Sequence, residues 1–214
     1  MPCLPLIPGK IVVMISAILL AAGESRRMGR PKQLLEWQGK ALLLHVLENL
    51  INSSADEIIL VLGHEAEQIR KSLPEFQIKI VINPNYERGM ASSLRQGLLA
   101  MDPRSEAFLV LLADQPGIGP EIINRVIRNF QQADPKRGIG LPVYRGLQGH
   151  PVLIGVQYLQ EALQLQGDVG ARQILMNHPT DILEIDVDQD VVLMDMDTPE
   201  EYQKYMKRAG PGGS

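Results

Sequence analysis

The chain of 214 residues contains a single cysteine, Cys3. One cysteine excludes an internal disulfide and indicates a reducing compartment, so we expect a cytoplasmic protein. Long hydrophobic runs are lacking as well, because no apolar stretch reaches the roughly 20 residues that a membrane helix needs. The sequence therefore predicts no membrane partner.

An excess of positive charge is also absent, because 21 lysines and arginines stand against 25 aspartates and glutamates, a net charge of −4. This balance leaves no generally basic surface for nucleic acid, so we expect no nucleic-acid partner. Any anionic ligand must instead be bound by a local cluster of basic side chains. The length of the chain suits one domain with a sizeable core.

The two ends of the chain differ in composition from its middle. Residues 1–13 contain three prolines and precede the first apolar run, and we interpret them as an N-terminal extension without an assignable role. Residues 210–214 are rich in glycine and are expected to form a flexible tail. A single domain is then predicted over residues 14–209, and the sequence leaves open whether Met1 or Met14 is the natural start.

Two common phosphate-binding fingerprints are missing from the first loop, residues 20–32. No Gly-Lys-Ser/Thr closes it, and it lacks the G-x-G-x-x-G pattern of nicotinamide-dependent oxidoreductases. The loop does contain two glycines and four basic residues: Gly23, Gly29, Arg26, Arg27, Arg30 and Lys32. Glycine lets the backbone approach a ligand closely, and the basic side chains favour a polyphosphate. The alternative is a surface turn whose arginines face water, and for Arg26 and Arg30 the two interpretations are equally good.

Short apolar runs alternate with segments of helical periodicity and predict an α/β fold. Strands are expected at residues 15–20, 57–62, 77–82, 107–112, 138–143, 149–155, 182–187 and 191–194. Helices are expected at residues 42–50, 63–73, 120–132, 156–164 and 171–177, from a cap at Ser92 or Ser93 to residue 101, and from Thr198 onward. This order predicts a doubly wound, mostly parallel sheet with right-handed crossovers. Strands 138–143 and 149–155 are too close for a helical crossover and predict a small antiparallel ribbon or edge.

Two aspartates follow predicted strands that lie far apart in the sequence. Asp114 comes directly after strand 107–112, and Asp197 follows the last short strand. The carboxyl ends of parallel strands meet at one edge of the sheet, where open α/β folds bind ligands. Two carboxylates there suit Mg²⁺, which takes about six oxygen ligands and usually keeps several waters. Asp197 has a second interpretation as a helix cap, and Asp195 is a weaker metal candidate.

The pattern L-A-A-G-x-S-x-R-M-G-x-x-K at residues 20–32 resembles the signature loop of nucleotidyltransferases. Within that superfamily the chain is similar to the molybdenum cofactor cytidylyltransferases and their near relatives. Further matches are LADQP at residues 112–116, GHPVL at 149–153, GDVGAR at 167–172 and DMDTPE at 195–200. The resemblance spans residues 15–202 and implies a Rossmann-like nucleotidyltransferase fold.

This resemblance implies Mg²⁺-dependent transfer of a cytidylyl group from CTP to the phosphate of molybdopterin cofactor, with release of pyrophosphate. It assigns Arg27 and Lys32 to the triphosphate and makes them catalytic together with Asp114, while Asp114 and Asp197 hold the metal. Charge grows on the departing pyrophosphate, where a fixed cation stabilises the transition state most. The implied partners are CTP, a phosphorylated pterin cofactor, and a molybdoenzyme or its chaperone.

The resemblance also implies the rest of the substrate site. Base contacts come from the main chain at Leu20 to Ala22 and from the turn between Gly89 and Ser92, and His150 lies beside the acceptor substrate. The implied nucleotide site comprises Leu20, Ala21, Ala22, Gly23, Arg26, Arg27, Lys32, Gly89, Ser92 and Asp114. Ala-Ala-Gly accompanies cytidine use in this family, so the methyl group of Ala22 is a candidate for excluding purines.

Several alternatives remain open at this point. The chain resembles enzymes that transfer a cytidylyl or guanylyl group to another small phosphate, such as methylerythritol phosphate or a sugar phosphate. From a different class, it could be a non-catalytic nucleotide-binding or cofactor-binding module. The joint presence of Arg27, Lys32, Asp114 and Asp197 favours an enzyme.

Overall fold

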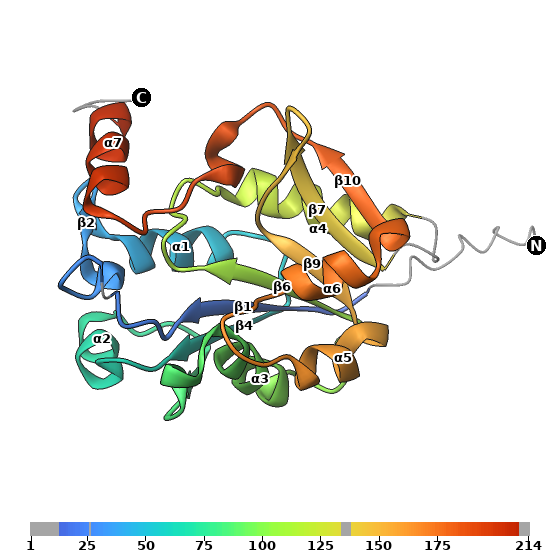
Figure 1. Cartoon of the computed structure of the whole chain (residues 1–214), viewed down its shortest axis with the longest axis horizontal. Helices are drawn as coiled ribbons and strands as arrows, with labels where there is room; N and C mark the ends of the chain where they lie inside the picture. Colours follow the sequence, from blue (N-terminus) through green and yellow to red (C-terminus); the bar gives the residue numbers. More distant parts are fainter. Residues whose placement is uncertain (1–12, 26, 134–137, 210–214) are drawn as a thin grey trace, which may run out of the picture.

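The computed structural model describes residues 13–25, 27–133 and 138–209. Its main feature is an eight-stranded sheet in which seven strands follow the order β10-β7-β9-β6-β1-β4-β5 and β8 pairs with β7 (Figure 1). The strands are β1 (Ile15–Ala21), β4 (Glu57–Leu62), β5 (Lys79–Ile82), β6 (Ala107–Leu112), β7 (Ile139–Tyr144), β8 (Leu147–Gln148), β9 (Val152–Gly155) and β10 (Ile182–Asp186). This mixed, mostly parallel sheet confirms the predicted fold class.

Strand β1 lies in the middle of the sheet and is buried along its whole length. It pairs in parallel with β4 on one side and β6 on the other. Its side chains alternate between two hydrophobic clusters: Leu19 packs in one, and Ile18 and Leu20 pack in the other. Because both faces are covered, successive positions of this strand can be apolar, which explains the apolar run that follows Ser16 in the sequence.

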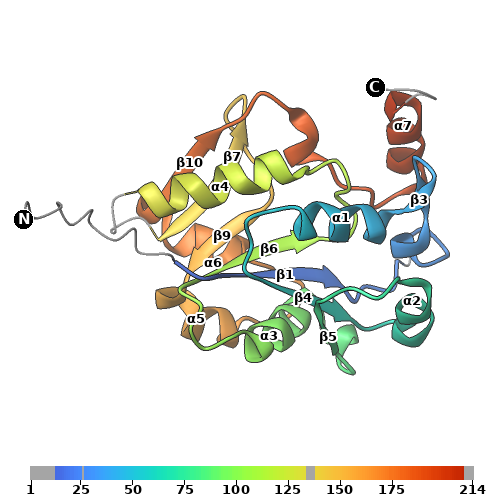
Figure 2. The ribbon, with the colours of Figure 1, turned by 180° about the vertical axis from the view of Figure 1, so that it is seen from behind.

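Helices cover both faces of the sheet, as two opposite views show (Figures 1 and 2). Helices α1 (Leu42–Ile51) and α4 (Pro120–Gln132) lie on one face, with α2 (Ala66–Ser72) packing into the same cluster. Helices α3 (Met90–Ala100), α5 (Leu159–Gln164) and α6 (Arg172–Asn177) pack into the cluster of the other face. The doubly wound arrangement leaves the carboxyl ends of β1, β4 and β6 open at one edge.

The predicted antiparallel pairing of residues 138–143 with 149–155 is confirmed by β7 and β9, but the pair does not form an edge of the sheet. Strand β9 pairs antiparallel with both β6 and β7, so it lies inside the sheet and not at its edge. Close spacing in the sequence predicts the direction of pairing, but it does not determine on which side of β7 the strand inserts. A separate antiparallel ribbon is formed by β2 (Glu36–Trp37) and β3 (Lys40–Ala41).

Two local predictions were wrong. The expected strand at 191–194 is the 3₁₀ helix η5 (Asp190–Leu193), whose apolar side chains join the core without ladder pairing. Helix α3 starts after Gly89, and not after a serine cap. Gly89 has a φ of 96°, and a Cβ there would approach the Gly167 backbone to 2.4 Å, so only glycine fits this boundary.

The last helix, α7 (Pro199–Ala209), stands beside the β2–β3 ribbon in both views (Figures 1 and 2). A small cluster joins them: Trp37 and Tyr202 pack against buried Leu35 and Met196. No helix among the described residues is long and apolar enough to cross a membrane. The predicted extension, apart from Val13, and the predicted tail lie outside the described residues.

Candidate active site

A cleft of about 650 Å³ opens at the carboxyl edge of the sheet. Its walls come from the loop after β1, the turn at residues 86–90, the end of β6 and the segments around residues 168 and 195–197. Nine of the predicted site residues line it: Leu20, Ala21, Ala22, Gly23, Arg27, Lys32, Gly89, Asp114 and Asp197. Segments distant in the sequence therefore meet where the strand order predicts.

Four charged side chains form the centre of this cleft. The Lys32 ammonium is hydrogen-bonded to Asp114 and lies 2.7 Å from Asp197 Oδ1. Arg27 Nη2 donates to the other oxygen of Asp197 at 2.8 Å. Lys32 begins the 3₁₀ helix η1 (Lys32–Leu34), which fixes its backbone. The predicted basic loop and the two predicted carboxylates thus form one connected ion-pair cluster.

The electrostatics of the cluster favour the charged forms of Lys32 and Asp197. Burial lowers the pKa of Lys32, but the adjacent Asp114 and Asp197 outweigh that effect and raise it above its ordinary value. Burial acts to raise the pKa of Asp197, while Lys32 and Arg27 lower it by more. The cleft therefore holds the Lys32 ammonium and the Asp197 carboxylate at neutral pH.

The helix cap that was the alternative role of Asp197 is provided by the next residue, Thr198. The Glu201 N–H donates to Thr198 Oγ1 at 3.2 Å, and the Thr198 N–H donates to Glu201 Oε2 at 2.9 Å. This reciprocal pair is a capping box, with Thr198 as the N-cap of α7. The side chain of Asp197 is left to face Lys32 and Arg27.

Unsatisfied polar atoms gather behind the ion-pair cluster. Among the described residues, four buried side-chain polar atoms have no hydrogen-bond partner, and three of them are Asp114 Oδ1, Gln115 Oε1 and His150 Nδ1. Gln115 also links them to the cleft, because its Nε2 donates to Asp195 Oδ1 at 2.7 Å. Buried polar groups are rarely left unpaired, so this group is suited to receive a ligand, ion or water.

His150 and Asp195 have shifted ionisation in this region. Burial lowers the pKa of His150 although the nearby Asp195 and Asp114 oppose it, so the imidazole is neutral. Desolvation and the charge of Asp114 raise the pKa of Asp195, against the effects of Gln115 and His150. Asp195 lines the cleft and is exposed to it, whereas His150 is not among the lining residues.

The turn around Gly89 forms the opposite wall of the cleft. Gly89 packs against the Gly167 backbone, and the Met90 N–H donates to Asp168 Oδ1 at 3.2 Å. The Ser92 hydroxyl accepts from Asn83 Nδ2 at 2.9 Å and lies 2.8 Å from the carbonyl of Gly89. Ser92 supports the turn from behind, and it is Ser93 that lines the cleft.

Sequence reasoning missed several lining residues, namely Gln33, Tyr86, Arg88, Ser93 and Asp168. The signal for Asp168 was present, because it belongs to the matched segment 167–172. Arg26 lies outside the described residues, and Arg30 is exposed and does not line the cleft.

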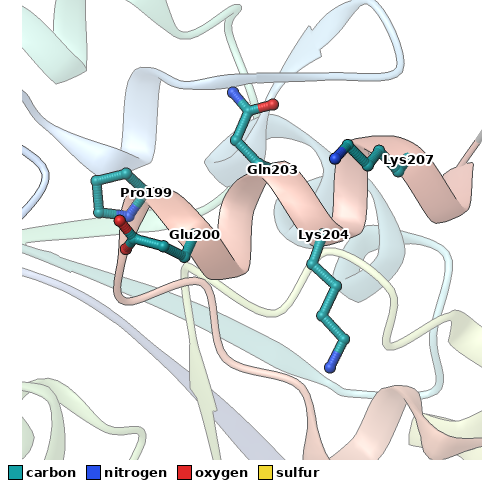
Figure 3. Close-up of a pocket in the computed structure, with 5 residues that line it drawn as sticks. All are labelled: Pro199, Glu200, Gln203, Lys204 and Lys207. Atoms are coloured by element: carbon teal, nitrogen blue, oxygen red, sulfur yellow. The ribbon is translucent and has the colours of Figure 1, made fainter.

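A second concavity, of about 620 Å³, follows the surface of α7 (Figure 3). Its lining residues all come from that one helix, and Figure 3 shows Gln203 and Lys204 projecting to opposite sides. Without convergent groups from a second element it offers no site for chemistry. The charged cleft is therefore the candidate active site.

No group of three or more histidine, cysteine, aspartate or glutamate side chains suited to a metal ion occurs in the part of the chain that the structure describes. A cation in the cleft would depend on Asp114 and Asp197 together with oxygens of a substrate and water.

Comparison with known proteins matches residues 17–182 to the MobA-like NTP transferase domain. Over 191 residues the chain is 27% identical to the molybdenum cofactor cytidylyltransferase of Escherichia coli K12, covering 88% of this chain and 93% of the relative. It is also 30% identical over 203 residues to a protein of Paenarthrobacter nicotinovorans named nicotine blue oxidoreductase, covering 90% and 96%.

Among solved structures, the crystal structure of Rv0371c from Mycobacterium tuberculosis H37Rv superposes with a TM-score of 0.83 at 30% identity, covering 91% of this chain and 98% of that one. A complex of the same protein with manganese superposes with a TM-score of 0.79 at 27% identity, covering 91% and 99%. The sequence match spans most of the domain, and the predicted nucleotidyltransferase class is confirmed. The chain belongs to the MobA-like NTP transferase family.

Proposed function

We propose that this nucleotidyltransferase transfers a cytidylyl group from CTP to the phosphate of molybdopterin cofactor, with Mg²⁺ as its metal. The observation that carries the proposal is the convergence of Lys32, Arg27, Asp114 and Asp197 in one cleft at the carboxyl edge of the sheet. Two fixed cations suit a triphosphate, and two carboxylates suit the metal that accompanies it.

The residues present fit a divalent cation. Lys32 places one positive charge between Asp114 and Asp197, which is where a cation shared by the two carboxylates would be bound. Asp114 Oδ1 is buried and lacks a protein partner, so it has a coordination position to offer. When bound by these two carboxylates, the metal would neutralise phosphate charge and orient the α-phosphoryl group.

The reaction itself requires positioning more than proton transfer. An oxygen of the acceptor phosphate attacks the α-phosphorus of CTP, a new P–O bond forms, and the bond to the β-phosphate oxygen breaks. Pyrophosphate leaves with its electron pair, and Lys32 and Arg27 stabilise the charge that develops on it. A phosphate ester is already ionised at neutral pH, so the attacking oxygen needs no general base.

Base selection is assigned to Ala22 in this proposal. Its carbonyl accepts from the His64 N–H at 3.1 Å, and its methyl group would lie 2.8 Å from a Cβ placed on Gly63. These contacts fix Ala22, which lines the cleft, and we assign to its methyl group the exclusion of the larger purine ring. Replacement by glycine is expected to relax the preference for CTP over GTP.

The acceptor is assigned to the region of His150. The Asp195 carboxylate lines the cleft and accepts a hydrogen bond from Gln115 Nε2, and the amino-pyrimidinone ring of a pterin supplies further N–H donors. A pterin therefore fits this group, and because the hydroxyl groups of methylerythritol phosphate also donate hydrogen bonds, the product assay below decides between the two acceptors.

The test is product analysis by mass spectrometry with purified protein, Mg²⁺, pterin cofactor and CTP, GTP or ATP in parallel. We expect the cytidine dinucleotide of the cofactor and one pyrophosphate for each product. Preference for GTP would contradict the base assignment, and transfer to methylerythritol phosphate would contradict the acceptor. One relative is named an oxidoreductase, so a control reaction tests for that activity with NADPH and no CTP. Oxidation of NADPH in this control would contradict the proposed chemistry.

A further inference from the structure

Gln33 is a polar side chain buried beneath the loop after β1, with 1% of its surface exposed. Its amide nitrogen donates to the carbonyl of Ala21 at 2.9 Å and to the carbonyl of Gly23 at 3.1 Å. Its amide oxygen lies 3.5 Å from the hydroxyl of Ser25. The Gln33 side chain therefore contacts three alternate residues at the start of the loop, Ala21, Gly23 and Ser25.

The same side chain also joins the two ends of the loop. Ser25 Oγ accepts a hydrogen bond from the Lys32 N–H at 3.0 Å, and Lys32 directly precedes Gln33. Ser25 has a φ of 55°, which is unfavourable for a residue other than glycine and is held only by surrounding contacts. Gln33 thus connects the backbone that starts the loop to the lysine that ends it.

The carbonyls at the end of β1 are all occupied by protein donors. Leu20 accepts from the Ala113 N–H at 3.1 Å, and Ala22 accepts from the His64 N–H at 3.1 Å. Gln33 binds the two carbonyls that alternate with these, at Ala21 and Gly23. In a planar trans peptide the N–H points opposite to the C=O, so these contacts set the direction of the peptide N–H groups along the cleft wall.

We propose that Gln33 is a positioning residue for nucleotide binding: it fixes the peptide planes after Ala21 and Gly23 and the placement of Lys32, so that the loop fits the β- and γ-phosphates. This inference rests on the proposed function, because it requires that the loop binds a nucleoside triphosphate. Gln33 itself touches no phosphate. Replacing Gln33 should therefore weaken the binding of a nucleoside triphosphate more than that of a nucleoside monophosphate.

The test uses two variants of Gln33. Gln33→Met keeps the length of the side chain and removes both donors, and Gln33→Glu keeps the shape but points an acceptor at two carbonyl oxygens. Titration calorimetry with CTP and with CMP, each with Mg²⁺, measures the phosphate-dependent part of binding. We expect the dissociation constant for CTP to rise about tenfold or more, and that for CMP to change by less than about twofold. In turnover, KM for CTP rises while KM for the acceptor stays unchanged.

Asn49 on α1 supplies a matched control. Its Nδ2 donates to the carbonyls of Pro116 and Ile118 at 3.1 and 3.0 Å, so it bridges two alternate carbonyls as Gln33 does, but outside the cleft lining. Asn49→Leu should lower the thermal stability and leave the ratio of CTP to CMP affinity unchanged.

The outcomes separate the two proposals. If the unmodified protein does not bind CTP, the proposed function fails. If it binds CTP but Gln33→Met weakens CTP and CMP equally, or if Asn49→Leu changes the ratio as much, the role of Gln33 fails alone. Should neither Gln33 variant fold while Asn49→Leu does, Gln33 serves folding and the positioning role is contradicted.

Discussion

Charged side chains lie at both edges of the central sheet, but the two groups differ in how completely their polar atoms are hydrogen-bonded. At the amino edge, Glu57 Oε2 accepts from the Ser16 hydroxyl at 2.5 Å and from the Asp102 N–H at 2.9 Å. Lys79 Nζ binds Glu57 Oε1 at 2.7 Å, and Ser16 and Ser105 share a hydrogen bond of 2.6 Å. Each of these polar side-chain atoms has a protein partner.

At the carboxyl edge the protein leaves partners missing. Lys32 bridges two carboxylates there, as Lys79 serves Glu57 at the other edge, yet Asp114 Oδ1 and Gln115 Oε1 are buried without a partner. A satisfied network stabilises the fold, whereas unsatisfied buried groups are retained at a cost and indicate a ligand. Charge alone therefore does not distinguish the two edges; charge together with unpaired buried oxygens does.

The comparison predicts its largest effect at Asp114. Asp114→Asn removes the charge that we propose binds the metal, so turnover should fall by about a thousandfold, with the fold intact by circular dichroism. The matched change at the amino edge, Glu57→Gln, should leave turnover within about twofold. Pyrophosphate release measured for both variants tests the difference, and equal turnover in the two would contradict the assignment.

A smaller effect is expected at Lys32. Lys32→Met removes the cation from the triphosphate and lowers turnover by about a hundredfold. It also leaves Asp114 and Asp197 unneutralised, so Mn²⁺ should bind the nucleotide-free protein about tenfold more tightly, as followed by electron paramagnetic resonance. Unchanged Mn²⁺ affinity would mean that the two carboxylates do not share a metal.

Much of this site follows from the sequence. The shared location of Lys32 and Asp114 was predicted because each follows a strand of a parallel sheet, and it is confirmed by their direct contact. Asp197 was harder to assign, since the same residues also read as a helix start. The structure resolves the ambiguity through Thr198, which forms the cap and leaves Asp197 to face Lys32.

Other features could not be read from the residues. Gln33 binds backbone carbonyls, and every residue has one, so no spacing in the sequence indicates which carbonyls it meets. The insertion of β9 between β6 and β7 depends on long-range pairing. Segment 191–194 has the apolar pattern of a strand, but the same pattern suits a 3₁₀ helix that packs on the core.

The amino edge contributes to the acid stability of the protein through Glu57. Burial acts to raise the pKa of Glu57, but Lys79, Ser16 and the Asp102 N–H lower it below its ordinary value of 4.5. A carboxyl with a depressed pKa stabilises the folded state above the unfolded pKa, and this contribution disappears as the pH falls through the folded value. Glu57→Gln should lower the free energy of unfolding by about 1–2 kcal/mol at pH 7. Below pH 4.5 the difference between the two proteins should be smaller, because the unmodified protein then loses the contribution of Glu57 as well. Urea unfolding of the variant and the unmodified protein at pH 7 and below pH 4.5 measures both differences. If the free energies of unfolding of the two proteins differ by the same amount at every pH, the role of Glu57 is contradicted.

The smallest effect is expected at Lys79, the amino-edge counterpart of Lys32. Its side chain is 47% exposed, against 19% for Lys32, so solvent screens its ion pair with Glu57. Lys79→Met should lower the free energy of unfolding by less than about 1 kcal/mol and leave turnover unchanged, because exposed ion pairs contribute little. The Lys32→Met and Lys79→Met variants are compared by urea unfolding and by pyrophosphate release, because each lysine forms an ion pair with a carboxylate. A loss of turnover in Lys79→Met similar to that in Lys32→Met would show that both edges serve catalysis, and the distinction drawn from the unpaired oxygens would fail.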